Sequence, residues 1–193
     1  MRAFIAIEMP ETVRESLGAL RERFRRSGAR ASWVQTANMH LTLRFLGDVA
    51  RDDLSTLSAG LREACCGCAP LRLGVRGAGA FPSLRRPSVV WAGLKTLSGD
   101  LGAVQRCAEA AARAIGLPPE TKPFHPHVTL ARIRDTRQLG TLPDDLDAAR
   151  DFDGGDFTAA HVSLFSSELK PGGAVYRCLQ EFVLACPAPM PSS

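Results

Sequence analysis

The sequence predicts an α+β fold with mainly antiparallel strands. Segments with helical and strand periodicity alternate along the 193 residues, but strands also follow one another directly, which favours antiparallel pairing over repeated β-α-β units. In addition, the motif His-x-Thr at residues 40–42 recurs 87 positions later at residues 127–129. Two equivalent strands, one from each of two lobes that share a cleft, would bring these residues together.

The first half of the chain begins with a strand over 2–8, followed by a helix that Pro10 opens. The apolar residues of this helix recur at spacings of four, three and four: Val13, Leu17, Leu20 and Phe24. A second strand is expected over 39–46. A second helix begins at Asp52 and Asp53, and its apolar face consists of Leu54, Leu57 and Leu61.

The second half repeats this pattern. Two strands are expected over 70–81 and 88–95, with the turn-rich "PSLRRP" between them. A third helix over 99–115 buries Leu101, Val104, Ala108 and Ala111. A strand over 125–133, a polar loop that contains "LPDDLDAARDFDGGD", and closing strands over 157–165 and 174–185 complete the fold. We expect one domain over 1–186 and a disordered tail over 187–193.

Composition indicates an ordinary globular protein. Hydrophobic residues make up 45% of the chain, and no apolar run reaches the length needed to span a bilayer. The start "MRAFIAIEMP" is better explained by a strand than by a signal peptide, so a cytoplasmic location is expected.

The six cysteines are expected to be reduced thiols. Cys65 and Cys68 form a C-x-x-C, but Cys107, Cys178 and Cys186 are not spaced as the second pair of a zinc site. A helix end with small residues is therefore favoured over a metal or redox site.

The net charge of +4 is unevenly distributed. Six arginines crowd one N-terminal segment: Arg14, Arg21, Arg23, Arg25, Arg26 and Arg30. This pattern is typical of the solvated side of a helix, and attraction of phosphate or nucleic acid is the alternative.

Each His-x-Thr strand carries a possible site on one face. Successive side chains of a strand point to opposite sides, so His40 and Thr42 share a face while Leu41, Leu43 and Phe45 take the other. The same parity groups His127 with Thr129 and places Val128 and Leu130 behind them. Each strand thus offers a group that transfers protons near neutral pH and a hydroxyl about 6.5 Å along the strand.

Two such pairs suit in-line displacement at phosphorus. The reaction needs a base beside the entering oxygen, an acid beside the leaving oxygen, and donors for the equatorial oxygens. Two histidines and two threonines supply these groups, and the scheme requires no metal. The residues alone leave open which histidine is the acid.

The motifs "HLTLRFLGD" and "KPFHPHVTLAR" resemble the two H-x-T-x motifs of the two-histidine (2H) phosphoesterases, specifically the LigT-like RNA 2′,3′-cyclic phosphodiesterases once described as 2′-5′ RNA ligases. The resemblance extends over "RAFIAIEMP", "GAFPSLRRPSVVWAGL" and "VSLFSSELKPGGAVYRCLQEF", which is nearly the whole chain. It implies a bilobal fold with two mainly antiparallel sheets, pseudo-two-fold symmetry around a positively charged central cleft, and helices on the outside. It also implies an RNA or nucleotide substrate with a 2′,3′-cyclic phosphate, no metal or organic cofactor, no membrane or obligate protein partner, and a monomer.

The resemblance also assigns roles. His40 would donate a proton to the leaving O3′ and His127 would accept one from water, leaving a 2′-phosphate, with Thr42 and Thr129 completing the motifs. Arg132 matches the arginine that closes the second motif. Simple alternation puts Arg132 opposite His127 unless the strand twists or ends there, so a phosphate ligand and a structural ion pair both remain open.

Several residues are left out of this catalytic set, and several alternative functions remain open. His125 and His161 are left out of the catalytic set, and Trp33 and Phe81 are either core residues or base-stacking residues. The alternative functions are a 2H enzyme for other cyclic or 2′-5′-linked nucleotides, a non-catalytic RNA-binding module, and a metallohydrolase that uses the four histidines.

Overall fold

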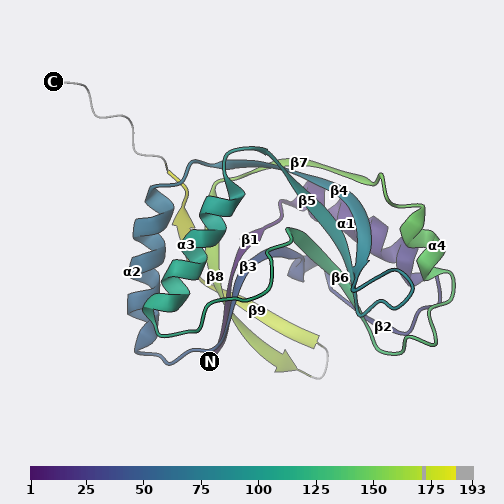
Figure 1. The fold of residues 1–193 in the computed structure, drawn as a ribbon, viewed down its shortest axis with the longest axis horizontal. Coiled ribbons are helices and arrows are strands. Elements are labelled where there is room, and N and C mark those ends of the chain that lie inside the picture. Colours follow the sequence, from purple (N-terminus) through teal and green to yellow (C-terminus); the bar gives the residue numbers. More distant parts are fainter. Residues whose placement is uncertain (171–172, 186–193) are drawn as a thin grey trace.

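Nine antiparallel strands form one curled sheet in the computed structural model, which describes residues 1–170 and 173–185 (Figure 1). The elements in chain order are β1 Arg2–Glu8, α1 Glu11–Arg25, β2 Ala31–Trp33, the short helix η1 Thr36–Asn38, β3 His40–Asp48, α2 Asp53–Cys66, β4 Leu71–Phe81, β5 Val89–Ser98, α3 Leu101–Ala114, β6 His127–Ile133, α4 Leu142–Asp147, β7 Asp153–Ala159, β8 His161–Lys170 and β9 Gly173–Val183. The strand order is β7-β4-β5-β6-β3-β1-β8-β9, and β2 pairs with β6. The expected α+β fold with antiparallel strands is confirmed.

The sheet divides into two lobes at its centre. The His40 lobe consists of β3, β1, β8 and β9 and is covered by α2 and α3, whereas the His127 lobe consists of β6, β5, β4, β7 and β2 and is covered by α1 and α4. The strands β3 and β6 meet through one registered pair, Leu41 with Val128. Because of this pair, the two sheets expected from the sequence are joined edge to edge into one.

In each lobe, one of the covering helices follows a strand of the other lobe in the chain. Helix α1 follows β1 of the His40 lobe but packs on β7, β6 and α4, and helix α3 follows β5 of the His127 lobe but packs on β3 and α2. The chain therefore crosses between the lobes repeatedly, and the two lobes are not separate domains in sequence.

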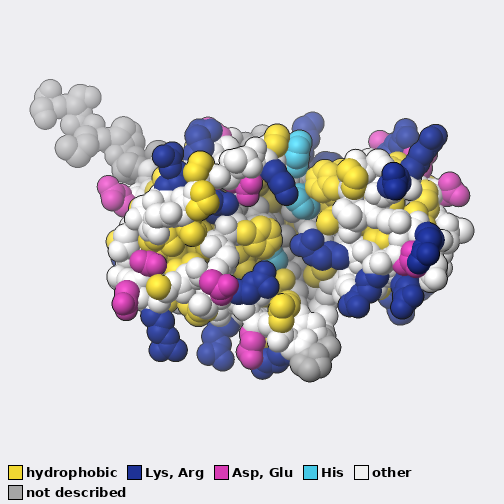
Figure 2. Space-filling view, turned by 60° about the horizontal axis from the view of Figure 1, so that its bottom comes forward, with side chains coloured by type: hydrophobic (Ala, Val, Ile, Leu, Met, Phe, Trp, Pro, Cys, Tyr) yellow, Lys and Arg dark blue, Asp and Glu magenta, His cyan; other side chains and the backbone are white. Residues whose placement is uncertain are grey.

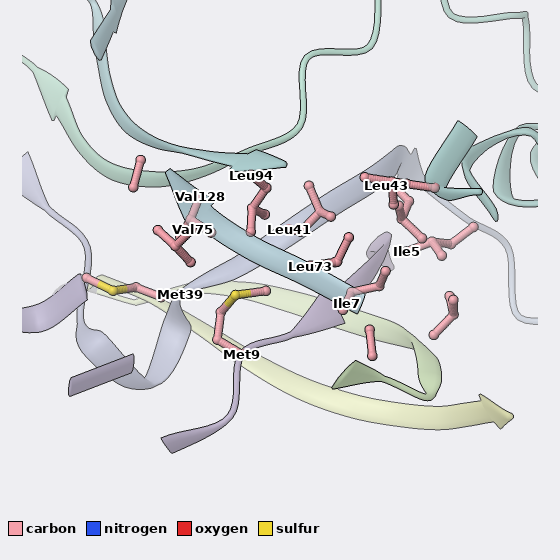
Figure 3. Packing of buried hydrophobic residues seen from close by; sticks show 14 of the residues in the cluster. Ile5, Ile7, Met9, Met39, Leu41, Leu43, Leu73, Val75, Leu94 and Val128 are labelled. Atoms are coloured by element: carbon pink, nitrogen blue, oxygen red, sulfur yellow. The ribbon is translucent and has the colours of Figure 1, made fainter. Parts of the chain in front are cut away.

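The hydrophobic core lies between the helices and one face of the sheet. The apolar residues predicted from helical spacing are buried in α1 and α3, and in α2 Leu57 and Leu61 are buried while Leu54 is half-buried. In Figure 3 Leu41 of the His40 lobe lies close to Val128, Leu94 and Val75 of the His127 lobe. The central strands thus have one face in the core, which leaves the other face free for a site.

The region after residue 140 differs from the expectation. The predicted polar loop contains α4, because Leu142 and Leu146, one helical turn apart, are both buried in the core. The strand expected over 157–165 is two strands, since the chain changes lobes at Ala160: β7 pairs with β4 and β8 pairs with β1. The short strand β2 was not predicted at all. The tail predicted over 187–193 lies outside the described residues.

None of the helices in the described part of the chain combines the length and the apolar character that crossing a membrane requires.

Candidate active site

Two β-bulges shape the candidate site. Between β1 and β3, Ala6 pairs with Thr42 and Ile5 with Arg44, so Leu43 is left without a partner. Between β5 and β6, Trp91 pairs with Thr129 and Val90 with Ala131, so Leu130 is left out in the same way. In each strand the residue after the threonine is the extra one, and two consecutive side chains then point into the core.

The bulges correct one prediction and resolve another. Phe45, expected in the core by simple alternation, is 58% exposed and lines the cleft. Arg132 likewise returns to the face of His127 and Thr129 and lines the cleft. A bulge inserts one residue into the alternation, so every later side chain of the strand changes sides.

The antiparallel pair of Leu41 with Val128 fixes how the two motifs face each other. Continuing this register by one residue in each direction sets His40 opposite Thr129 and Thr42 opposite His127. Each histidine therefore has the threonine of the other strand as its cross-strand neighbour. On this register the four residues are the corners of a quadrilateral, on the face of the sheet opposite the buried Leu41 and Val128.

Both histidines make the same hydrogen bond. Nδ1 of His40 lies 2.7 Å from the carbonyl oxygen of Asn38, and Nδ1 of His127 lies 2.6 Å from the carbonyl oxygen of His125. A carbonyl oxygen only accepts, so Nδ1 carries the proton and donates it in both rings. Nε2 of each ring then remains as the nitrogen that accepts or releases a proton toward a substrate.

Aromatic side chains hold the His40 ring. Phe4 stacks on it with a centroid distance of 4.7 Å, and Tyr176 meets it edge-on at 5.4 Å. The His127 ring has one such neighbour among the described residues, Phe81, which meets it edge-on at 5.2 Å. His40 is thus the more enclosed of the two rings.

Both imidazoles are tuned toward the neutral form. Burial lowers the pKa of His40 below its usual value, the Asn38 carbonyl opposes this, and the charge of His127 lowers the pKa further. Burial also lowers the pKa of His127, with the His125 carbonyl opposing and the charges of His125 and Arg132 adding to the decrease.

A cavity of about 590 Å³ opens beside these residues. It is lined by Arg2, Ala3, Phe4, Ser32, Trp33, Val34, Gln35, Asn38, His40, Thr42, Phe45, Gly47, Thr129, Arg132, Arg134, Ser167, Leu169, Gly173, Ala174 and Tyr176. Four of the five predicted site residues lie in this wall. The fifth, His127, shares a strand face with Thr129 but lies next to the cavity, on the side of Phe81.

The cavity wall is positively charged. The described residues that line the cavity include three arginines and no aspartate or glutamate. Among residues 1–170 and 173–185, none of Arg2, Arg132 and Arg134 forms a salt bridge. Figure 2 shows Lys and Arg side chains on both sides of the middle of this face, with histidine between them. Such a surface attracts anions, and of the two roles left open for Arg132 it disfavours the ion pair.

Tyr176, the single tyrosine of the chain, was not singled out from the sequence. Its ring contacts Phe4 and His40, and burial raises the pKa of its phenol while the charges of Arg132 and Arg2 oppose the rise. Asn38, also missed, donates from its amide to the Ala174 carbonyl at 2.8 Å and so ties β9 to the start of β3. Both residues act through contacts between distant segments, which no local pattern signals.

The remaining candidates lie around the site or away from it. Trp33 is half-buried, packing on the core while it lines the cavity, and Phe81 is half-buried beside His125 and His127. His161 is exposed at the start of β8 and does not line the cavity.

The described cysteines are free thiols. Cys65 lies in the last turn of α2, and Cys68 Sγ lies 3.6 Å from Cys107 Sγ of α3. Burial raises the pKa of Cys65 to about 12 and that of Cys107 to about 11, so both remain protonated at neutral pH. In the part of the chain that the structure describes, no three His, Cys, Asp or Glu side chains converge as metal ligands.

Known proteins are similar to this chain in sequence. The family model described as "LigT like Phosphoesterase" matches residues 7–91 and 94–176. The RNA 2′,3′-cyclic phosphodiesterase of Aeropyrum pernix is 35% identical over 165 residues, which cover 86% of this chain and 93% of that protein.

Two solved structures extend the similarity to three dimensions. A crystal structure of a Thermus thermophilus protein has a TM-score of 0.77 at 30% identity and covers 97% of this chain and 100% of its own. LigT of E. coli in complex with 3′-AMP has a TM-score of 0.71 at 25% identity and covers 95% of this chain and 97% of its own.

Proposed function

The chain belongs to the LigT-like phosphoesterase family, and from this premise we propose that it hydrolyses the 2′,3′-cyclic phosphate at the end of an RNA by two-histidine acid-base catalysis. The observation that carries the proposal is the duplicated geometry. Two histidines with the same Nδ1 hydrogen bond face each other's threonine across one antiparallel pair. The relative from Aeropyrum pernix, named for this activity, supports the choice of substrate.

In the proposed reaction the two histidines begin in opposite protonation states. Neutral His127 accepts a proton at Nε2 from the attacking water, whose oxygen forms a bond to phosphorus. The bond from phosphorus to O3′ breaks, and the imidazolium of His40 donates its Nε2 proton to O3′. One proton is taken up and one is released, so exchange with solvent restores both rings.

The threonines and Arg132 are assigned to the charge that develops on phosphorus. Thr42 and Thr129 lie between the histidines in the quadrilateral, where their hydroxyls would donate to the non-bridging oxygens. Arg132, without a salt bridge among the described residues, would add a charged donor on the side of Thr129. Such donors stabilise the transition state most where water is excluded.

No step in this scheme uses a metal. We therefore expect turnover to persist after exhaustive treatment with EDTA. Loss of activity that zinc or manganese restores would replace acid-base catalysis by metal-assisted hydrolysis.

The product identifies which bond breaks. Hydrolysis of 2′,3′-cyclic AMP, followed by separation of the two monophosphates, should give nearly pure 2′-AMP if His40 lies beside O3′. A pure 3′-AMP product would mean that the ribose binds the other way round. A mixture would contradict a site that holds the ribose in one orientation.

A further inference from the structure

The two arginines at the ends of the cavity have no task in the hydrolysis of one phosphate. Arg2 lies one same-face position beyond Phe4, whose ring covers His40, and this position is about 6.6 Å farther along β1. Arg134 lies one same-face position beyond Arg132, just after the end of β6. Arg2 and Arg134 therefore lie just outside the group of residues assigned to the reacting phosphate.

The bonding of these two arginines leaves most of their donors available. Arg134 donates from Nε to the Ser32 hydroxyl, which orients the guanidinium along the cavity wall. In the described part of the chain Arg2 makes no side-chain hydrogen bond and neither arginine makes a salt bridge. Arginines elsewhere behave differently: Arg76 pairs with Asp153 at 2.8 Å and also with Asp156.

The cavity extends across strands of both lobes. A volume of about 590 Å³ is in the middle of the range of ligand sites, and its wall runs from β1 and β3 across to β2 and β6. Phe45 and Trp33 offer exposed ring surface within it, and bases stack on such surfaces irrespective of sequence. Cationic donors, aromatic surface and the absence of carboxylates from the described wall together are the features of a single-stranded nucleic acid site.

We propose that Arg2 and Arg134 bind phosphodiesters upstream of the cyclic end, so that the enzyme selects oligoribonucleotides over cyclic mononucleotides. The proposal rests on the proposed function for its reacting end, and it adds the preference for an oligonucleotide over a mononucleotide and the two residues that select it. A cyclic mononucleotide has no upstream phosphate, so it cannot use either arginine.

The test compares kcat/KM for 2′,3′-cyclic AMP with kcat/KM for a tri-adenylate that ends in a 2′,3′-cyclic phosphate. The wild-type enzyme should prefer the trinucleotide by about a hundredfold, because each of the two arginines contributes a charged hydrogen bond worth roughly tenfold. Arg2→Gln and Arg134→Gln should each reduce this preference by about tenfold. Arg62→Gln, which removes an exposed charge from α2 of the His40 lobe away from the cavity, should leave both substrates unchanged.

A binding measurement separates this proposal from the proposed function. Titration of the tri-adenylate carrying a 2′-phosphate, against 2′-AMP as reference, requires no turnover. The slope of log Kd against log salt should fall by about one for each arginine removed. Equal affinity for the two ligands, or a preference that both variants retain, overturns the proposal whether or not cyclic phosphates are hydrolysed. Absence of hydrolysis with preferential binding of the trinucleotide would overturn only the proposed function.

Discussion

The strands β3 and β6 carry the same motif and the same bulge, yet the kinds of side chain that they place in the core and in the cleft are exchanged. After the bulge, β3 points Arg44 into the core and Phe45 into the cleft, whereas β6 points Ala131 into the core and Arg132 into the cleft. Arg44, only 9% exposed, pairs under α3 with Glu109 at 2.8 Å.

This difference makes a nearly symmetric site directional. The histidines and threonines are equivalent by register, so they give a cyclic phosphate no reason to bind one way round. If the chain binds a cyclic nucleotide as proposed, we expect Arg132 on one side to contact the phosphoryl oxygens and the exposed ring of Phe45 on the other to stack on the nucleobase. On this proposal, two side chains outside the H-x-T motifs set the orientation on which the acid and base roles depend.

The largest effect tests whether the two halves are equally needed. His40→Ala and His127→Ala should each lower kcat for the cyclic substrate by about two to four orders of magnitude, since each ring transfers one proton. Product affinity should remain close to that of wild type. His161→Ala, an exposed histidine outside the cavity, serves as control and should stay within a few-fold. A dispensable His127 with an essential His161 would invalidate the motif assignment.

The threonines test the symmetric part of the site. Thr42→Val and Thr129→Val should each reduce kcat by about a hundredfold, because one donor to a charged oxygen is lost while the volume is kept. Thr158→Val on the exposed face of β7 is a matched control. If only one of the two cleft threonines matters, the phosphate is held by one half and not by both.

Replacing Arg44 should affect mainly stability, whereas replacing Arg132 should affect mainly activity. Arg44→Ala should lower the free energy of unfolding by about 3 kcal/mol, since it leaves Glu109 without its partner. Arg132→Ala should change stability by less than about 0.5 kcal/mol but lower kcat/KM about tenfold or more. Urea denaturation and steady-state kinetics on both variants measure this. Equal losses of stability would mean that Arg132 is a structural residue.

The smallest effect is a shift in the pH profile. Both histidines have lowered pKa values, so the bell-shaped profile of kcat/KM should have its maximum on the acid side of about pH 6.5. The positive charge of Arg132 lowers the pKa of His127, so Arg132→Gln should move one limb of the bell to higher pH. Initial rates from about pH 4 to about pH 8, measured for wild type and Arg132→Gln, give the direction of the shift. A shift of the limb to lower pH would contradict the placement of Arg132 beside His127.

Local patterns predicted α1, α2, α3 and most strands, because apolar spacing in α1 and α3 records directly which residues are buried, but they missed α4, which lies in the segment expected to be a polar loop. They also placed His40 with Thr42 and His127 with Thr129 on shared faces. The bulges could not be predicted, since the partner strand determines which residue is left unpaired, and so Phe45 was assigned to the wrong face. Tyr176 reaches His40 from β9, far along the chain, and only the fold brings the two together.

The exchange of α1 and α3 between the lobes has a consequence for folding. Each lobe buries its sheet partly with a helix that follows a strand of the other lobe, so a fragment containing one lobe's strands would lack one of the two helices that cover it. Unfolding should therefore be one cooperative transition, and slow hydrogen exchange should extend equally over β3 and β6. A destabilising change beneath either histidine is then felt at both, and the acid and the base of the cleft are lost together when the chain opens.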